Sequence, residues 1–425
     1  NIPCIPIRTC TASSIKYTPG KLVIEGKTKQ VFDVVNNPNY AILKSKDRIT
    51  AGDGAKAHDL AGKAEVSTST TCKVFQLLNT FGIKTAFVKQ LDSVSMLAKK
   101  CEMIPIEWVT RRVATGSYIR RFPGTVKLSP LVSGISIHLT RREHFGLQDD
   151  ANHDPFWPHH QIVSANFKFN GLTIGKGEVE IMKRTSITIF EVLEKAWATR
   201  DCTLIDMKIE FGVDQSGEIV LADVIDSDSW RLWPSGDRRL MKDKQVYRNL
   251  NNVTADDLAT VIKNFRWISD QLDLIVAGAP SKVVIVMASP GDKDHTSSIA
   301  KHCSALGLQA EIRVSSAHKT TTDTLDIVAE YEGSSEPVVF IAVAGRSNGL
   351  GPVIAGNTVI HDIWSSLNTP SGLGCTTVRY PEAAAQAAAS IHALSNHAIW
   401  SRLRVKQLSN FIKLKQVDKE SRNQS

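Results

Sequence analysis

The chain has 425 residues, too many for one ordinary hydrophobic core, so the length predicts two domains. An apolar content of 42% and a charged content of 22% are typical of a globular protein and exclude a disordered chain. The longest apolar run, near residues 283–287, is too short to cross a bilayer, so we expect no membrane contact.

The net charge of +8 suits either nucleic acid or small anionic substrates. Basic residues are dispersed among acidic ones, without a Lys/Arg block interleaved with aromatics, so we favour phosphorylated small molecules and expect no nucleic-acid partner. Seven scattered cysteines without a CxxC pair indicate free thiols in a reducing compartment. The first twenty residues show no secretory signal, so we expect a cytoplasmic protein.

The first region alternates between strand and helix patterns. Helical periodicity appears at 67–80, 186–197 and 254–276, with Ser or Thr placed to cap the helix starts. Strands separated by turns are expected at 21–24, 30–35, 40–43, 203–211 and 218–225. These patterns predict an α+β domain with largely antiparallel sheets over residues 20–278.

The pattern of predicted elements changes near residue 279, where we place the domain boundary. Strands at 283–287, 310–314 and 337–343 alternate with helices at 294–306 and 321–331. This order predicts an α/β three-layer domain with a parallel sheet over residues 279–425, and ligands at the carboxyl ends of its strands. We expect the lysine-rich tail after residue 416 to be frayed.

Charged side chains in the first region suggest phosphate chemistry. The turn at Gly26, Lys27 and Lys29 combines a close backbone approach with positive charge, although a plain basic hairpin turn is an alternative. Asp206, Lys208 and Glu210 share one face of a strand, and the hairpin partner brings Asp223 to the same end. Carboxylates beside a lysine favour a nucleotide–magnesium site, with an exposed salt-bridged face as the alternative.

Five strings in this region resemble those of SAICAR synthetases, which join aspartate to carboxyaminoimidazole ribotide (CAIR) using ATP. They are GKTK at 26–29, ITAGDG at 49–54, RRVATGS at 111–117, LIDMKIEFG at 204–212 and DVIDSDSWR at 223–231. The resemblance implies Gly26, Lys27 and Lys29 at the ATP phosphates, and Glu210 and Asp223 as Mg²⁺ ligands. It implies Arg111, Ser117 and Arg231 at the ribotide phosphate, and Lys208 and Asp228 at the imidazole and carboxylate.

The resemblance also implies the reaction: ATP phosphorylates the CAIR carboxylate, and the aspartate amine attacks the resulting acyl phosphate. One stretch, 128–148, departs from the family pattern. Asp149 and Asp150, which lead into the aspartate-handling loop, remain, but Gln148 stands where the family carries lysine.

Three loops in the second region follow successive strands and converge in this architecture: 287–292, 315–319 and 342–352. A single histidine is more often structural, but within Ser-Ala-His-Lys we interpret His318 as functional. The loops resemble the AIR carboxylase domain of animal bifunctional enzymes, which makes CAIR from AIR and CO₂ without ATP. The resemblance implies Ser289 and Asp292 at phosphate and ribose, Ser316, His318 and Lys319 at the base, and Gly345, Arg346 and Ser347 in the carboxylation loop.

Two departures mark this second region. The family's Gly-Ser-Thr-Ser-Asp loop is here Ala288 to Asp292 with Pro290 inside it, which constrains the turn. After residue 358 a dozen or more residues of the family pattern are absent, including most of one strand.

Three functional hypotheses follow. The first is a bifunctional enzyme of de novo purine biosynthesis, with AIR, CO₂, CAIR and L-aspartate as substrates and ATP and Mg²⁺ as cofactors. The second is an active ligase whose defective carboxylase domain serves as an oligomerisation scaffold. The third is a non-catalytic nucleotide-binding regulator. The resemblance implies a homo-oligomer formed through the C-terminal domain.

Overall fold

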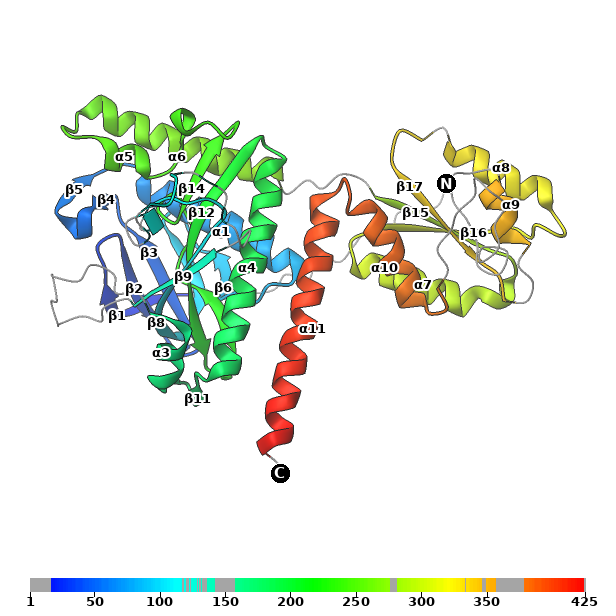
Figure 1. The fold of residues 1–425 in the computed structure, drawn as a ribbon, viewed down its shortest axis with the longest axis horizontal. Helices are drawn as coiled ribbons and strands as arrows, with labels where there is room; N and C mark the ends of the chain where they lie inside the picture. The colour runs from blue at the N-terminus through cyan, green and yellow to red at the C-terminus, as the bar shows by residue number, and fades with distance from the viewer. Residues whose placement is uncertain are drawn as a thin grey trace.

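The computed structural model describes residues 17–423, except 117, 120, 121, 123, 128, 130, 132–135, 142–156, 276–280, 333, 346–348 and 357–377. Figure 1 shows two sheet-containing bodies, with the long last helix lying beside the first of them. The predicted boundary near 279 falls outside the described residues. No helix in the described part of the chain has both the length and the apolarity needed to cross a bilayer.

The first sheet is an antiparallel meander, as the alternating sequence predicts. It contains β1 (Pro19–Glu25), β2 (Lys29–Val34), β3 (Tyr40–Ser45), β6 (Phe87–Gln90) and β7 (Ser95–Lys99) in the order β1-β2-β3-β7-β6. Two short strands, β4 (Arg48–Ala51) and β5 (Lys56–Asp59), form a separate hairpin around the 3₁₀ turn Gly52–Gly54.

The second sheet is also antiparallel and centres on β12 (Cys202–Asp214). The order is β13-β12-β8-β9, with β8 (Cys101–Arg111), β9 (Ser136–Arg141) and β13 (Ile219–Ala222), while β14 (Trp230–Pro234) pairs with the first half of β12. The backbone N–H of Ala86 donates to the Leu221 carbonyl at 2.7 Å, which ties β13 to the first sheet. Two strands of two residues each, β10 (Lys168–Phe169) and β11 (Leu172–Thr173), form a small antiparallel hairpin.

The helices of this body are α1 (Lys63–Phe81), α3 (His159–Ser164), α4 (Lys176–Ala198), α5 (Gln245–Asn249) and α6 (Ala255–Ile275), with a 3₁₀ turn at Arg238–Leu240. The expected cap is present only at α6, where the hydroxyl of Thr254 accepts the N–H of Asp257. The starts predicted for α1 and α4 were wrong by four and ten residues, because both helices begin after glycines, Gly62 and Gly175. The first ten residues of α4 carry the buried apolar side chains Val179 and Met182 among charged and polar residues, which obscures the helical pattern in the sequence.

The second body has three layers around a parallel sheet, as predicted. Its strands are β15 (Lys282–Met287), β16 (Gln309–Val314) and β17 (Val338–Val343), in the order β16-β15-β17 among the described residues. Alternate residues of β15 face opposite sides. Val283 and Ile285 pack with α7 (Lys293–Ala305) and α10 (Pro381–His392), and Val284 and Val286 pack with α8 (Thr321–Glu332) and α9 (Leu350–Gly356).

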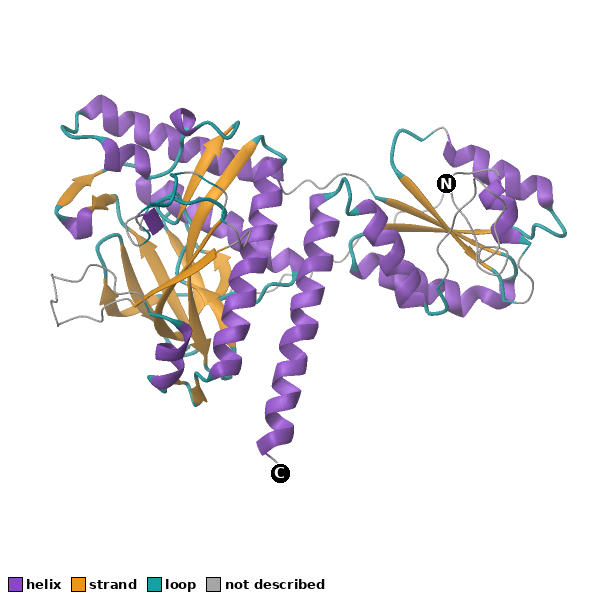
Figure 2. Cartoon of the chain, in the orientation of Figure 1, coloured by secondary structure: helices purple, strands orange, loops and turns teal. Residues whose placement is uncertain are grey.

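The last helix, α11 (His397–Asn423), continues well past residue 416, as the secondary-structure view in Figure 2 shows. The expectation of a frayed tail was therefore wrong for residues 417–423. The polar side chains there have a partner, since Lys419 Nζ donates to Glu178 Oε1 of α4 at 2.5 Å.

Candidate active sites

The middle of β12 presents three charged side chains on one face and the domain core on the other. Met207, Ile209 and Phe211 point into the hydrophobic core. On the opposite face Asp206 is 4% exposed and Glu210 is 3% exposed. The alternative of an exposed charged face was thus wrong for these two carboxylates, because neighbouring strands cover them.

Lys208 lies between two carboxylates on this face. Its Nζ is 2.7 Å from Glu107 Oε1 and 3.7 Å from Glu210 Oε1. Glu107 belongs to β8, where it stands directly opposite Glu210 in the register. Sequence reasoning did not select Glu107, because only the pairing of β8 with β12 brings it to the site.

The basic turn between β1 and β2 reaches the same region of the sheet. Lys29 forms an ion pair with Asp223, which directly follows β13 and has a left-handed backbone at φ 61°. A Cβ at Gly54 would lie 3.5 Å from Lys27 Nζ, so the lysine packs close to this backbone, whose φ of 99° favours glycine. The turn therefore lies beside the carboxylate that follows β13.

The described residues contain no cluster of three or more His, Cys, Asp or Glu side chains suited to a metal ion. Magnesium typically takes one or two protein carboxylates and completes its shell with phosphate oxygens and water. Glu210 and Asp223 fit that pattern, since Glu210 is paired with Ala222 in the register and Asp223 is the next residue. The ammonium groups of Lys208 and Lys29 offset their charge here.

Two arginines flank Asp206 from the strands on either side of β12. Asp206 is in register with Arg111 of β8 and with Arg231 of β14. Arg231 Nη1 donates to Asp206 Oδ2, and Arg111 Nη2 lies 3.9 Å from the same oxygen. A Cβ at Gly116 would lie 3.0 Å from Arg231 Nη2, which explains a glycine there. Ser117 lies outside the described residues.

Asp228 forms a second charged cluster with two lysines that sequence reasoning did not select. Its Oδ2 is 3.0 Å from Lys244 Nζ and 3.5 Å from Lys63 Nζ. Burial raises the pKa of Asp228, but the two ammonium groups outweigh it and lower that pKa to about 2.

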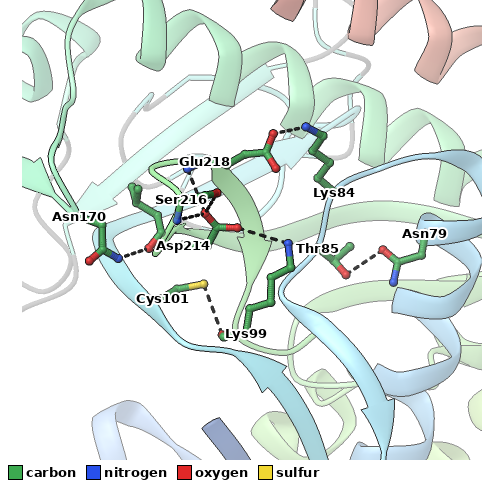
Figure 3. A network of polar contacts seen from close by, with 10 residues as sticks. Asn79, Lys84, Thr85, Lys99, Cys101, Asn170, Asp214, Ser216 and Glu218 are labelled. Carbon is green, nitrogen blue, oxygen red and sulfur yellow. Dashed lines mark hydrogen bonds and ion pairs between the residues drawn. The ribbon is translucent and has the colours of Figure 1, made fainter. Parts of the chain in front are cut away.

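The turn after β12 connects it to β13, and Asp214 holds this turn through contacts with Ser216, Glu218 and Lys99 (Figure 3). Asp214 Oδ1 accepts the backbone N–H groups of Ser216 and Glu218 at 3.0 and 3.1 Å. Lys99 Nζ donates to Asp214 Oδ2 at 3.3 Å. Burial raises the pKa of Asp214, but these hydrogen bonds outweigh it and lower the pKa. The ionised carboxylate fixes the turn and therefore the β12–β13 register.

The loops after β15, β16 and β17 meet at one end of the parallel sheet, as predicted. A Cβ at Gly345 would lie 2.5 Å from Asp292 Oδ1, and one at Gly349 would lie 2.3 Å from the His318 ring. Ser289 Oγ accepts the N–H of Gly291 at 3.2 Å and begins the 3₁₀ turn Pro290–Asp292. His318 and Lys319 are exposed beside Ser316, whose carbonyl accepts the N–H of Lys319. Arg346 and Ser347 lie outside the described residues.

Part of the stretch that departs from the family pattern is strand. Residues 136–141 form β9 and pair with β8 from Ile106 to Arg111. Asp149 and Asp150 lie outside the described residues, as does the region after residue 358 where the family pattern is interrupted.

Comparisons with known proteins agree with this architecture. The SAICAR synthetase family matches residues 22–263, and the AIR carboxylase family matches residues 282–411. The bifunctional phosphoribosylaminoimidazole carboxylase/phosphoribosylaminoimidazole succinocarboxamide synthetase of Drosophila melanogaster is 57% identical over 97% of this chain and 98% of that protein. The Homo sapiens protein of the same name is 50% identical over 95% of this chain and 97% of its own length.

Solved structures resemble the first body. Phosphoribosylaminoimidazole-succinocarboxamide synthase from Ehrlichia chaffeensis matches with a TM-score of 0.51 at 29% identity, over 60% of this chain and 98% of that chain. A SAICAR synthetase in complex with ADP matches with a TM-score of 0.50 at 28% identity, over 59% of this chain and 96% of that chain.

The fold and the two family matches define a protein that fuses a ligase-type domain to a carboxylase-type domain. The chain belongs to the SAICAR synthetase family, in the bifunctional form that carries an AIR carboxylase domain behind the synthetase. The predicted family and fold class are thereby confirmed. The roles of individual residues and the domain limits stay predictions.

Proposed function

We propose that this chain catalyses two reactions of de novo purine biosynthesis. The C-terminal domain converts AIR and CO₂ to CAIR without ATP, and the N-terminal domain joins CAIR to L-aspartate with ATP and Mg²⁺ to give SAICAR. The observation that carries the ligase reaction is the buried charged face of β12, where Glu210, Lys208 and Glu107 converge. Relatives of nearly full-length similarity support the combination.

We assign the nucleotide end of the ligase site to the β1–β2 turn and the β12–β13 hairpin. Gly26, Lys27 and Lys29 contact ATP phosphates, and Glu210 and Asp223 hold Mg²⁺. A bound magnesium would offset charge on the phosphate oxygens. The ion pair between Lys29 and Asp223 places a phosphate-binding cation beside a metal-binding carboxylate. The solved relative bound to ADP is consistent with nucleotide use.

The ribotide occupies the other end of the same face. Arg111, Arg231 and Ser117 bind its phosphate, and Asp206 holds the two guanidinium groups in place. Lys208 and Asp228 contact the imidazole and carboxylate, and Asp149 and Asp150 receive aspartate. The γ-phosphoryl group passes to the CAIR carboxylate, ADP leaves, and the aspartate amine displaces phosphate. The lysines and arginines offset the charge that develops in both steps.

The loops at the end of the parallel sheet form the carboxylase site. Ser289 and Asp292 bind phosphate and ribose, Ser316, His318 and Lys319 surround the reacting base, and Gly345, Arg346 and Ser347 form the carboxylation loop. The contacts of Gly345 with Asp292 and of Gly349 with His318 bring the three loops together. We further propose a cytoplasmic homo-oligomer joined through the C-terminal domain, whose size sedimentation would measure.

The test supplies AIR, bicarbonate, aspartate and MgATP and measures SAICAR. Formation of SAICAR supports both activities, whereas no aspartate-dependent release of ADP from CAIR and ATP would refute the ligase. AIR and bicarbonate alone separate the bifunctional enzyme from the ligase with a scaffold domain, because a scaffold-only C-terminal domain makes no CAIR. The altered 288–292 loop is the reason for testing the carboxylase activity separately with AIR and bicarbonate. A Glu210→Ala variant that retains full ligase activity would show that the metal-binding role assigned to Glu210 is incidental.

A further inference from the structure

The helix α11 begins within the AIR carboxylase match, which ends at residue 411, but it also packs on the N-terminal domain. Its first turn contributes Ile399 to the core around β15, α7 and α10. Farther along, Val405 and Leu408 belong to the hydrophobic core of the N-terminal domain. Figure 1 shows α11 running alongside α4. One helix thus supplies apolar side chains to both cores.

Polar contacts between α11 and α4 extend along both helices. Arg404 Nε donates to Glu191 Oε2 at 2.7 Å, and Lys419 Nζ donates to Glu178 Oε1 at 2.5 Å. The guanidinium of Arg184 lies 4.0 Å from the centre of the Phe411 ring. The contacts on α4 span residues 178–191, about 20 Å of helix at 1.5 Å per residue. This is a specific interface with apolar, ionic and aromatic components.

A further contact ties α11 to the end of α1. Arg402 Nη1 donates to the Thr80 carbonyl at 3.0 Å, and its guanidinium lies 5.7 Å from the centre of the Phe81 ring. A cation that binds the last carbonyls of a helix satisfies groups that have no intrahelical partner. A Cβ at Gly307 would lie 2.7 Å from Arg402 Nε, so the loop before β16 covers the other side of this arginine.

The partner helix α4 supports the strand end that carries Arg111. Glu194 of α4 binds Arg112 through two parallel contacts, at 2.7 Å to Nε and 2.6 Å to Nη2. Such bidentate pairs fix geometry as well as adding energy. A displacement of α4 would therefore move Arg112, which is next to Arg111, the residue assigned to the ribotide phosphate.

We infer that α11 is a structural part of the ligase domain, and that ligase activity in this chain depends on its packing against α4. The Ehrlichia synthase has 98% of its length matched by 60% of this chain, which leaves little room in it for a counterpart of α11. The dependence of activity rests on the proposed function. The packing of α11 against α4 does not rest on the proposed function. Unfolding and hydrogen-exchange measurements therefore test the packing separately from activity.

The first test compares the same substitution at two positions of α11 in the full chain. Leu408 is 5% exposed, and Leu414 is 70% exposed. We expect Leu408→Ala to lower the melting temperature of the ligase domain by about 5 °C or more, to speed amide exchange in α4, and to raise KM for CAIR several-fold. Leu414→Ala should leave all three unchanged. Equal behaviour of the two variants would overturn the inference.

The second test reverses an ion pair without removing core atoms. Arg404→Glu or Glu191→Arg alone places like charges together and should speed exchange in α4 and weaken ligase activity about 3-fold or more. The double variant should recover most of both losses. A double variant no better than either single change overturns the inference. If amide exchange in α4 responds to these substitutions as expected but the wild-type chain makes no SAICAR, the proposed function is refuted and the packing inference stands.

Discussion

At the scale of residues, the proposed ligase site holds carboxylates and lysines that offset one another's charge. Glu210 is adjacent to Lys208, which also contacts Glu107. Glu210→Gln keeps the shape of the side chain but removes one of the two charges assigned to magnesium. We expect SAICAR formation from CAIR to fall about 100-fold or more, because the charge is lost in a site with little water.

The control for this variant lies on the same hairpin. Glu218 pairs with Lys84 at the start of β13, outside the charged face. Glu218→Gln should keep ligase activity within about 2-fold, because exposed ion pairs contribute little. Consumption of AIR by the carboxylase domain should be equal in both variants. A Glu210→Gln chain as active as Glu218→Gln would contradict the metal assignment.

Asp243 gives a pH dependence of stability. Its carboxylate accepts N–H groups from Leu232 and Gln245, but burial raises its pKa from 3.8 to about 6. The folded chain therefore keeps this proton up to about pH 6, while the unfolded chain releases it near pH 4. Stability contributed by this group is present below pH 4 and is lost as the pH rises to about 6.

Asp243→Asn has no proton to release in this range. The free energy of unfolding of the variant minus that of the wild type should rise by up to about 3 kcal/mol between pH 4 and pH 6, and then level off. Urea unfolding at several pH values measures the difference. A difference that stays flat, or that falls with pH, would show that Asp243 is ionised in the folded chain.

Some of these residues could be predicted from sequence and others could not. The period of two along β12 places Asp206, Lys208 and Glu210 on one face from sequence alone. Glu107 and Lys63 join the sites only through strand register and helix packing. No local pattern marks them, because their partners are about 100 or more residues away in the chain.

At the scale of elements, the close pairing of β12 with β8 sets where the site residues stand. A Cβ at Gly212 would lie 2.7 Å from Cys101 Cβ and 3.3 Å from Met103 Sδ. We expect Gly212→Ala to separate the strands, to lower the free energy of unfolding by about 1–3 kcal/mol, and to reduce ligase activity. Chemical denaturation with a SAICAR assay measures both effects.

Gly177 offers the matched control in the first turn of α4. A Cβ there has nothing within 4 Å, and its backbone is helical. Gly177→Ala should therefore stabilise the chain by about 0.5–1 kcal/mol, since alanine favours the helix. If Gly212→Ala were equally neutral or stabilising, the close approach of β8 and β12 would not constrain the sheet.

Element boundaries show where sequence patterns stop being informative. Strands with one buried face were placed within a few residues, because burial imposes the alternation. The last turns of α11 are polar, so no apolar period marks them. The first ten residues of α4 carry the buried apolar side chains Val179 and Met182, but charged and polar residues surround them and obscure the helical pattern. The pair formed by Lys419 and Glu178 joins these two helix ends. Such mutual support has no local signature in the chain.

At the scale of the whole molecule, two sites built on different principles share one chain. The proposed ligase site lies on the face of an antiparallel sheet, whereas the proposed carboxylase site lies in loops at the end of a parallel sheet. Glu210 lies on β12 of the antiparallel sheet, whereas His318 follows β16 of the separate parallel sheet. A substitution at one site should therefore leave the chemistry of the other intact, even though α11 joins the two domains.

That independence predicts complementation between two inactive chains. Glu210→Gln should make CAIR from AIR but no SAICAR, while His318→Asn should make SAICAR from supplied CAIR but not from AIR. An equal mixture of the two variants, given AIR, bicarbonate, aspartate and MgATP, should form SAICAR at a substantial fraction of the wild-type rate, because CAIR made by one chain can be used by another. Failure of the mixture, with each variant keeping its remaining activity, would mean that CAIR passes only between sites of the same chain.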